Sequence, residues 1–95
     1  MNYKHIVLFK IYDQINEDRF QEALKILEQL GKGNPDIIQW SVKPTIDTRK
    51  GRIIIEDSIF KDEESFQKFR TSEAHNQASA VMKEISDWLV GDYLL

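Results

Sequence analysis

Apolar and polar residues alternate with a period of two along residues 3–12. In an extended strand, one side would carry apolar side chains interrupted by a single imidazole: Tyr3, His5, Val7, Phe9 and Ile11. The opposite side would carry Ile6 and Leu8 between two lysines. Because both sides are largely apolar, we expect the central strand of a sheet that is covered on both faces. The alternation places His5 on the more apolar side, where it is the first candidate for chemistry.

Helical spacing follows in residues 17–30, where apolar side chains recur every three or four positions. Asn16 precedes this stretch and has the side chain of a good N-cap. Gly31 and Gly33 come directly after it, at the positions where glycine commonly ends a helix. These features together predict one amphipathic helix over residues 17–30.

A second helical region is predicted in the last third of the chain. Asp62 can cap a short helix that carries Phe66 and Phe69 on one face, and Ser72 can cap a longer helix. We expect the longer helix to end within residues 87–91. Its apolar stripe is predicted to consist of Ala74, Ala78, Val81, Met82, Ile85 and Leu89.

Three further strands complete the predicted secondary structure. Residues 37–43 alternate again, residues 52–60 contain three consecutive isoleucines, and residues 92–95 form a short apolar end. The order strand, helix, strand, strand, helix pair, strand is the split βαβ arrangement of a ferredoxin-like α+β fold. Such a fold has a four-stranded antiparallel sheet with its helices on one face.

The second face of this sheet would be left bare, with apolar side chains from the first and third predicted strands. An exposed apolar patch of this kind usually marks an interface. The simplest way to cover it is a second copy of the chain that is related by two-fold symmetry. We therefore expect a homodimer through the sheet face.

Composition narrows the choice of partners. The 95 residues form a single domain, residues 1–95, with a net charge of −3 and no basic stripe, which argues against nucleic acid. The absence of cysteine excludes disulfides, thiolate metal sites and cysteine nucleophiles, and fits the reducing cytoplasm. Neither a membrane-length apolar run nor a signal-peptide pattern occurs, so we expect a cytoplasmic protein that does not associate with membranes.

The two histidines are the main candidates for chemistry. His75 lies on the first turn of the last predicted helix, and that helix would pack against the face that carries His5. Two imidazoles in one cavity are suited to general acid–base catalysis at neutral pH. The alternative is that each histidine is a half-buried structural residue that hydrogen-bonds to the backbone. Spacing alone leaves both interpretations open.

Other side chains offer weaker candidates. Glu73 or Asn76 could join the histidines as metal ligands, but the spacing typical of such sites is missing, so we expect no metal and no cofactor. Glu56 and Asp57 could be a base and its partner. We favour the interpretation that they mark the point where the third strand leaves the core, because unpaired buried carboxylates are costly. Several aromatic side chains could line a ligand pocket or simply form the core: Tyr3, Phe9, Trp40, Phe66 and Phe69.

Five segments taken together resemble the stress-responsive α/β-barrel family, often called Dabb domains. These segments are KHIVLFK at residues 4–10, GNPDI at 33–37, IFKDEESFQKF at 59–69, SEAHNQ at 72–77 and GDYLL at 91–95. They occur in the same order over essentially the whole chain. The resemblance implies a ferredoxin-like fold in which two subunits pair their sheets face to face as a dimeric α+β barrel.

The resemblance also implies possible site residues. Most members have no known reaction, but one branch includes a plant polyketide cyclase that closes a ring by aldol condensation without a cofactor. Its two pocket histidines match His5 and His75. Three further pocket residues of the cyclase, two tyrosines and a histidine, fall on Phe69, Leu27 and Ile54 here, so we do not expect the same reaction.

From these observations we expect a homodimer that binds a small apolar or aromatic ligand in a cavity near His75. His75 and His5 are the candidate catalytic residues. The expected pocket residues are Tyr3, Phe9, Leu27, Ile54 and Phe69. One alternative is a cofactor-free acid–base enzyme, resembling either an aldol cyclase or lyase or a monooxygenase. Another is a purely structural, stress-protective protein whose histidines serve packing.

Overall fold

The computed structural model describes all residues from Met1 to Leu95. Four strands and three helices follow one another in the order strand, helix, strand, strand, helix, helix, strand. They are β1 Tyr3–Ile11, α1 Glu17–Leu30, β2 Ile37–Pro44, β3 Ile53–Phe60, α2 Glu63–Arg70, α3 Glu73–Ile85 and β4 Ser86–Leu94.

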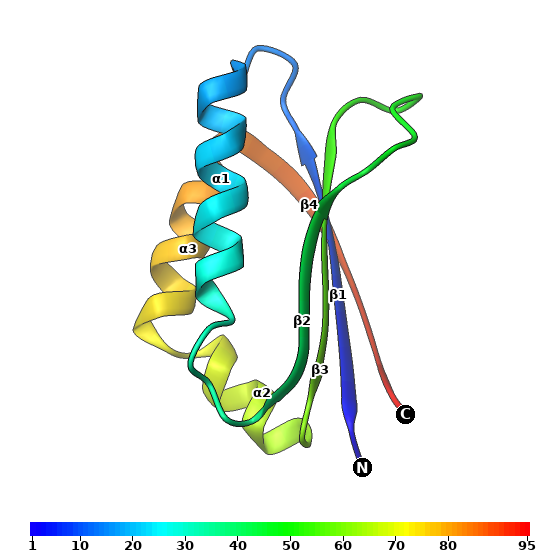
Figure 1. Cartoon of the computed structure of the whole chain (residues 1–95), viewed down its shortest axis with the longest axis vertical. Coiled ribbons are helices and arrows are strands. Elements are labelled where there is room, and N and C mark those ends of the chain that lie inside the picture. Colours follow the sequence, from blue (N-terminus) through cyan, green and yellow to red (C-terminus); the bar gives the residue numbers. More distant parts are fainter.

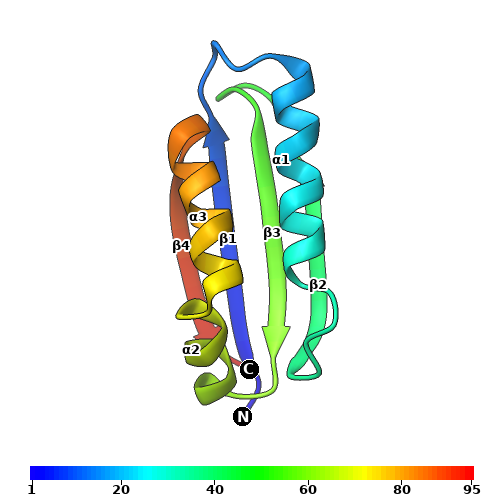
Figure 2. The ribbon, with the colours of Figure 1, turned by 90° about the vertical axis from the view of Figure 1, so that its left-hand side faces the viewer.

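The strands form one sheet in the order β2-β3-β1-β4, and every neighbouring pair is antiparallel. The helices cover one face of this sheet and leave the other uncovered (Figure 1). Seen from the helical side, α1 lies over β2 and β3, and α3 lies over β1 and β4 (Figure 2). This is the predicted ferredoxin-like α+β arrangement, and β1 is a central strand as its pattern indicated.

The main core lies between the sheet and the two long helices. Its eleven buried residues include Val7, Phe9 and Ile11 of β1, so the predicted face of this strand does meet the helices. A smaller cluster of Phe60, Phe66 and Phe69 lies against α2. Because burying one large apolar side chain contributes about 1.5–3 kcal/mol, these two clusters are the main source of stability.

The three predicted N-caps are confirmed. The side chains of Asn16, Asp62 and Ser72 each accept a hydrogen bond from a backbone N–H in the first turn of α1, α2 and α3 respectively. These bonds satisfy donors that a helix start leaves without a partner. The cap at Ser72 fixes where α3 begins, and it thereby fixes the position of His75.

The predicted boundary between the last helix and the last strand is wrong. Helix α3 ends at Ile85, and β4 begins at the next residue and pairs with β1 from Ser86 opposite Ile11 to Leu94 opposite Tyr3. Leu89, predicted on the helical stripe, lies in β4 opposite Leu8 and is 74% exposed. The long pairing satisfies the backbone groups of β4, and this outweighs the helical spacing of Leu89.

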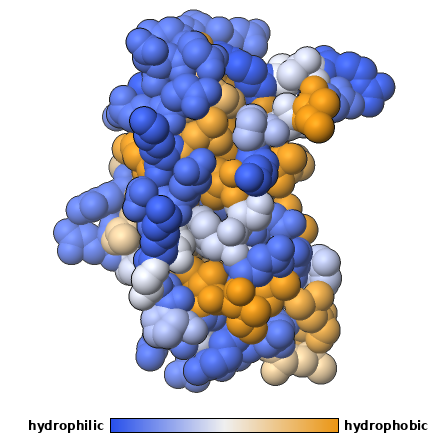
Figure 3. Space-filling view, in the orientation of Figure 1, coloured by the Kyte–Doolittle hydropathy of each residue, from blue (hydrophilic) through white to orange (hydrophobic).

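The uncovered face carries a continuous set of apolar side chains around Leu8, which is 39% exposed. Cross-strand neighbours share a face, so Ile55 and Leu89 lie on either side of Leu8. Hydrophobic residues gather toward the sheet side of the molecule, whereas the outer surfaces of the helices are mostly hydrophilic (Figure 3). None of the helices is both long enough and apolar enough to cross a membrane.

Candidate functional site

A cavity of about 510 Å³ lies between the sheet and the helices. Its walls come from β1, β3 and β4 on the sheet side and from all three helices on the other side. Eight lining residues are polar: Tyr3, His5, Glu56, Gln67, Arg70, His75, Ser79 and Asp92. The apolar lining consists of Val7, Phe9, Leu27, Leu30, Phe66, Ala78, Met82, Trp88 and Val90. Such a mixture of an apolar wall with a few convergent polar groups is typical of small-molecule sites.

His5 and His75 line this same cavity from opposite sides. His5 points into it because the period of two places the helix-facing side chains of β1 at odd numbers. His75 enters from the first turn of α3, directly after the Ser72 cap. The structure thus brings together the two histidines that are separated by most of the chain.

His5 is buried between two carboxylates. Its Nδ1 lies 2.7 Å from Asp92 Oδ1, and its Nε2 lies 3.5 Å from Glu56 Oε2. Burial disfavours the charged imidazolium, but the carboxylates of Glu56 and Asp92 outweigh burial and raise the pKa of His5 above its usual value. The carboxylates therefore favour the protonated form of His5, and both ring nitrogens are directed at acidic side chains.

Tyr3 completes this network. Its hydroxyl donates a hydrogen bond of 2.7 Å to Asp92 Oδ2, and its ring stacks on Phe66 at 4.5 Å. Burial and the bond to Asp92 together raise the pKa of Tyr3 to about 12. Both carboxylate oxygens of Asp92 are consequently engaged, one by Tyr3 and one by His5.

His75 lies in a different environment. Its ring packs edge-on against Phe69 at 5.1 Å, and its Nδ1 is 3.5 Å from the hydroxyl oxygen of Ser79. Burial lowers the pKa of His75, and the positive charges of His5 and Arg70 add to this, although Glu56 opposes it. His75 is therefore neutral near pH 7. Two groups of the same type whose pKa values are displaced in opposite directions are the usual arrangement of an acid and a base.

The interpretation that Glu56 marks the end of the buried strand is wrong. Glu56 lies in the middle of β3, is 3% exposed and lines the cavity, whereas Asp57 faces away from the helices and forms an ion pair with Lys4. The burial is tolerated because His5 supplies a positive charge next to Glu56.

The sequence contains a signal for this placement of Glu56. The period of two continues from Ile54 through Glu56 to Ser58 and Phe60, all four of which are buried. Extending the alternation of the third strand would therefore have placed Glu56 on the same face as its apolar neighbours.

The structure separates the five expected pocket residues into two groups. Tyr3, Phe9 and Leu27 line the cavity. Ile54 and Phe69 do not line it. Ile54 is fully buried in the main core, and the ring of Phe69 is enclosed by the aromatic cluster around α2. Their absence from the lining follows from close packing of both side chains against neighbouring core residues.

The cavity residues that were not singled out in the sequence include Asp92, Trp88 and Arg70. Trp88 lies within residues 87–91, where the last helix is expected to end, and Asp92 is the first residue of the short strand predicted over 92–95, so the sheet face of neither side chain could be assigned. Arg70 lies at the end of α2 and is exposed at the cavity. Asp92 lies opposite His5 because β4 pairs with β1 over its full length, and this pairing is seen only in the structure.

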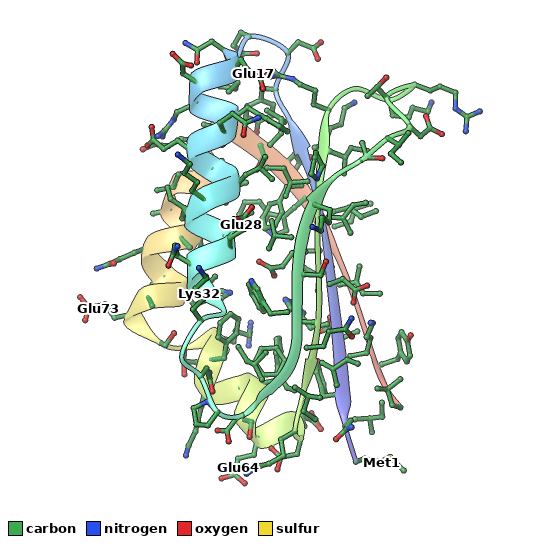
Figure 4. All side chains as sticks on the ribbon, viewed as in Figure 1. Met1, Glu17, Glu28, Lys32, Glu64 and Glu73 are labelled. Carbon is green, nitrogen blue, oxygen red and sulfur yellow. The ribbon has the colours of Figure 1, made fainter.

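The suggested metal ligands on α3 lie outside the cavity. Glu73 and Asn76 are both exposed, and Glu73 points away from the sheet (Figure 4). No three side chains of His, Cys, Asp or Glu are grouped so that they could hold a metal ion.

Comparison with known families identifies the chain. The model of the stress responsive A/B barrel domain, Dabb, matches residues 3–95. The chain belongs to this family. The match covers both histidines, and it extends through the whole of β4, the element that the sequence pattern defined least well. No curated protein matches this Dabb chain in sequence.

Solved structures share the fold of this Dabb chain at low sequence identity. A dimeric ferredoxin-like protein of unknown function from Thermobifida fusca superposes with a TM-score of 0.89 at 18% identity, covering 100% of this chain and 92% of its own. A hydroxynitrile lyase from Passiflora edulis gives a TM-score of 0.85 at 16% identity, covering 99% of this chain and 93% of the lyase chain. A mutant of SnoaB, a cofactor-independent oxygenase from Streptomyces nogalater, gives a TM-score of 0.81 at 7% identity, covering 99% of this chain and 92% of the oxygenase chain.

Proposed function

We propose that this Dabb protein is a homodimer that binds a small apolar or aromatic organic molecule in the cavity beside His75. The observation that carries the proposal is the cavity itself, which has an apolar wall and, at one side, a polar network around the buried His5. A purely structural, stress-protective protein would be expected to have a filled interior. The cavity therefore favours a binding protein over a structural one.

Dimerisation is supported by the uncovered sheet face. Leu8 and its cross-strand neighbours Ile55 and Leu89 would be buried if a second copy packed its sheet on this one. Several proteins with the same fold are described as dimeric, among them the one from Thermobifida fusca. Two-fold pairing of the sheets would close a dimeric α+β barrel with one cavity on each outer side.

A cofactor-free acid–base enzyme is the second candidate function. It is favoured by the opposite displacement of the two histidine pKa values, upward for His5 and downward for His75. His75 would abstract a proton beside a carbonyl group, and His5 would orient or protonate the substrate. The likeness to a hydroxynitrile lyase and to a cofactor-independent oxygenase supports this candidate only at the level of fold.

A thermal-shift screen with aromatic ketones and polyketide-like acids tests the proposed function. A ligand that fits the cavity is expected to raise the melting temperature in a concentration-dependent manner. In His75→Ala, any turnover found for such a ligand should be abolished while the melting temperature of the free protein stays nearly unchanged. A loss of several kcal/mol of stability in His75→Ala would instead indicate that His75 has a packing role.

A further inference from the structure

We propose that the cavity selects ligands whose polar head donates a hydrogen bond, a hydroxyl or an ammonium group, and that Glu56 is the residue that receives it. This inference rests on the proposed function, because it names the class of molecule that the same cavity would bind. It assigns to Glu56 a role that the two histidines do not fill.

The contacts of Glu56 leave acceptor capacity free. Its side chain is 4% exposed, and its one polar contact is the ion pair of 3.5 Å with Nε2 of His5. Charge-assisted hydrogen bonds of this type are usually about 2.7–2.9 Å long, so the contact engages the carboxylate only loosely. Glu56 is thus a buried carboxylate that lines the cavity and makes no short hydrogen bond with the protein.

Two groups that share the polar network with Glu56, His5 and Asp92, cannot take its place. Asp92 already accepts from Tyr3 and contacts His5, so both its oxygens are engaged. His5 directs one ring nitrogen at Asp92 and the other at Glu56, and nitrogens that face carboxylates donate hydrogen bonds, so His5 cannot accept one from a ligand. Among the acidic groups of the cavity, Glu56 is the one with capacity for a further partner.

The chemistry of a carboxylate then defines the ligand. An ionised carboxylate only accepts hydrogen bonds, and the contact of 3.5 Å with His5 leaves Glu56 without a donor at hydrogen-bonding distance. A hydroxyl or an ammonium beside Glu56 would supply the missing donor. A ketone or a carboxylate at the same place would bring acceptor against acceptor, which is unfavourable. The apolar part of the ligand would lie against Phe9, Met82 and Trp88.

Four compounds with the same aromatic body test this selectivity. Phenethylamine and phenethyl alcohol carry donor heads, whereas benzyl methyl ketone and phenylacetate carry acceptor heads. Dissociation constants are measured by calorimetry on the wild-type protein. At least one donor compound is expected to bind about tenfold more tightly than both acceptor compounds. If only phenethylamine binds tightly, the polar head of the preferred ligand is an ammonium group. If only phenethyl alcohol binds tightly, it is a hydroxyl group.

Variants assign the selectivity to Glu56. In Glu56→Gln, the donor compound is expected to lose about tenfold in affinity, while the acceptor compounds bind as well as before or better. Glu64→Gln is the matched control, because Glu64 is exposed on α2 outside the cavity, and it should change nothing. The selectivity of the wild-type protein needs no variant, so it remains decisive if Glu56→Gln fails to fold.

The outcomes separate this inference from the proposed function. Tighter binding of the ketone or of phenylacetate by the wild-type protein would overturn the inference and leave a ligand-binding cavity intact. Unchanged donor affinity in Glu56→Gln would also overturn it. If none of the four compounds binds and the thermal-shift screen is also negative, both proposals fail.

Discussion

His5 lies between carboxylates that come from two different strands, Asp92 of β4 and Glu56 of β3. With Tyr3 the four side chains form one connected polar network across three neighbouring strands. A buried imidazolium with two acidic neighbours is stable only while all of them stay in place. The network therefore ties the electrostatics of the cavity to the pairing of the strands.

The contribution of His5 to stability is expected to fall as the pH rises. Folding raises the pKa of His5 above its unfolded value of about 6.5. The stabilisation by protonated His5 is therefore complete below a pH of about 6.5, and it is lost as the pH rises through the pKa of His5 in the folded protein. Urea unfolding of the wild type and of His5→Gln measures the effect. The difference between their unfolding free energies should shrink as the pH increases.

His75 provides the internal check on this experiment. Its pKa is lowered, so its contribution has the opposite sign: it is present above the unfolded pKa and is lost as the pH falls. Both proteins retain His75, and burial, the largest cause of its lowered pKa, is common to them, so this part of its contribution cancels in their difference. A difference that stays constant or grows with pH would contradict the protonated state assigned to His5.

The candidate site could be predicted from the sequence only in part. Alternation placed His5 on the helix-facing side of its strand, and helix capping placed His75 at the start of the last helix. Asp92 could not be assigned, because its position depends on a strand pairing between residues far apart in the sequence. The general cost of a buried carboxylate argues against a buried Glu56, and the neighbouring His5 that offsets this cost cannot be recognised from the sequence.

At the level of elements, the connection between α1 and β2 depends on the close approach of the Trp40 indole to the backbone of Gly31. Gly31 ends α1 with an ordinary helical backbone conformation, so positive φ is not the reason for glycine there. A Cβ at this position would overlap the indole ring of Trp40. The indole in turn donates a hydrogen bond of 3.0 Å from Nε1 to the carbonyl oxygen of Leu27 near the end of α1. The missing side chain at Gly31 is what lets Trp40 close this helix end.

Gly31→Ala is therefore expected to destabilise the protein by about 1–3 kcal/mol, because the rigid indole must shift and its bond to Leu27 is lost. Chemical denaturation measures the loss. In a Trp40→Leu background the same change should cost less, since a smaller and more flexible side chain can move aside. An equal cost in both backgrounds would show that Trp40 is not the cause.

The elements themselves were predictable where one periodicity applied throughout. The bounds of α1 agree with its spacing and its cap, and β1 to β3 agree closely with their alternation. The boundary between α3 and β4 was not predictable in this way, because Leu89 continues the helical spacing of α3 and equally fits an outward position on a strand. Pairing with β1 decides between the two, and local sequence does not contain that information.

At the scale of the whole molecule, β1 contributes to both faces of the sheet. Its odd-numbered residues face the helices and the cavity, and Leu8 lies in the middle of the uncovered face. The proposed dimer would bury this face and give β1 the double covering that its pattern predicts.

Leu8→Glu is expected to convert the proposed dimer to a monomer, because a charge would be placed at the centre of an apolar interface. The fold should persist, since Leu8 is already 39% exposed in a single subunit. Sedimentation equilibrium measures the mass. Ala80→Glu adds the same charge to an exposed position of α3 and should leave the mass unchanged. A wild-type mass that corresponds to a monomer at every concentration would refute the dimer.

The ion pair of Lys4 with Asp57 has a consequence for how the sheet assembles. Lys4 directly precedes His5 in β1, and Asp57 directly follows Glu56 in β3. Lys4 and Asp57 therefore face the side of the sheet opposite to His5 and Glu56. If one strand slipped by a single residue, its side chains would exchange faces. A lysine or an aspartate would then enter the cavity without its partner, and a histidine or a glutamate would leave it. Charges on adjacent residues thus penalise misregistered intermediates during folding, so that the chain reaches a single strand alignment.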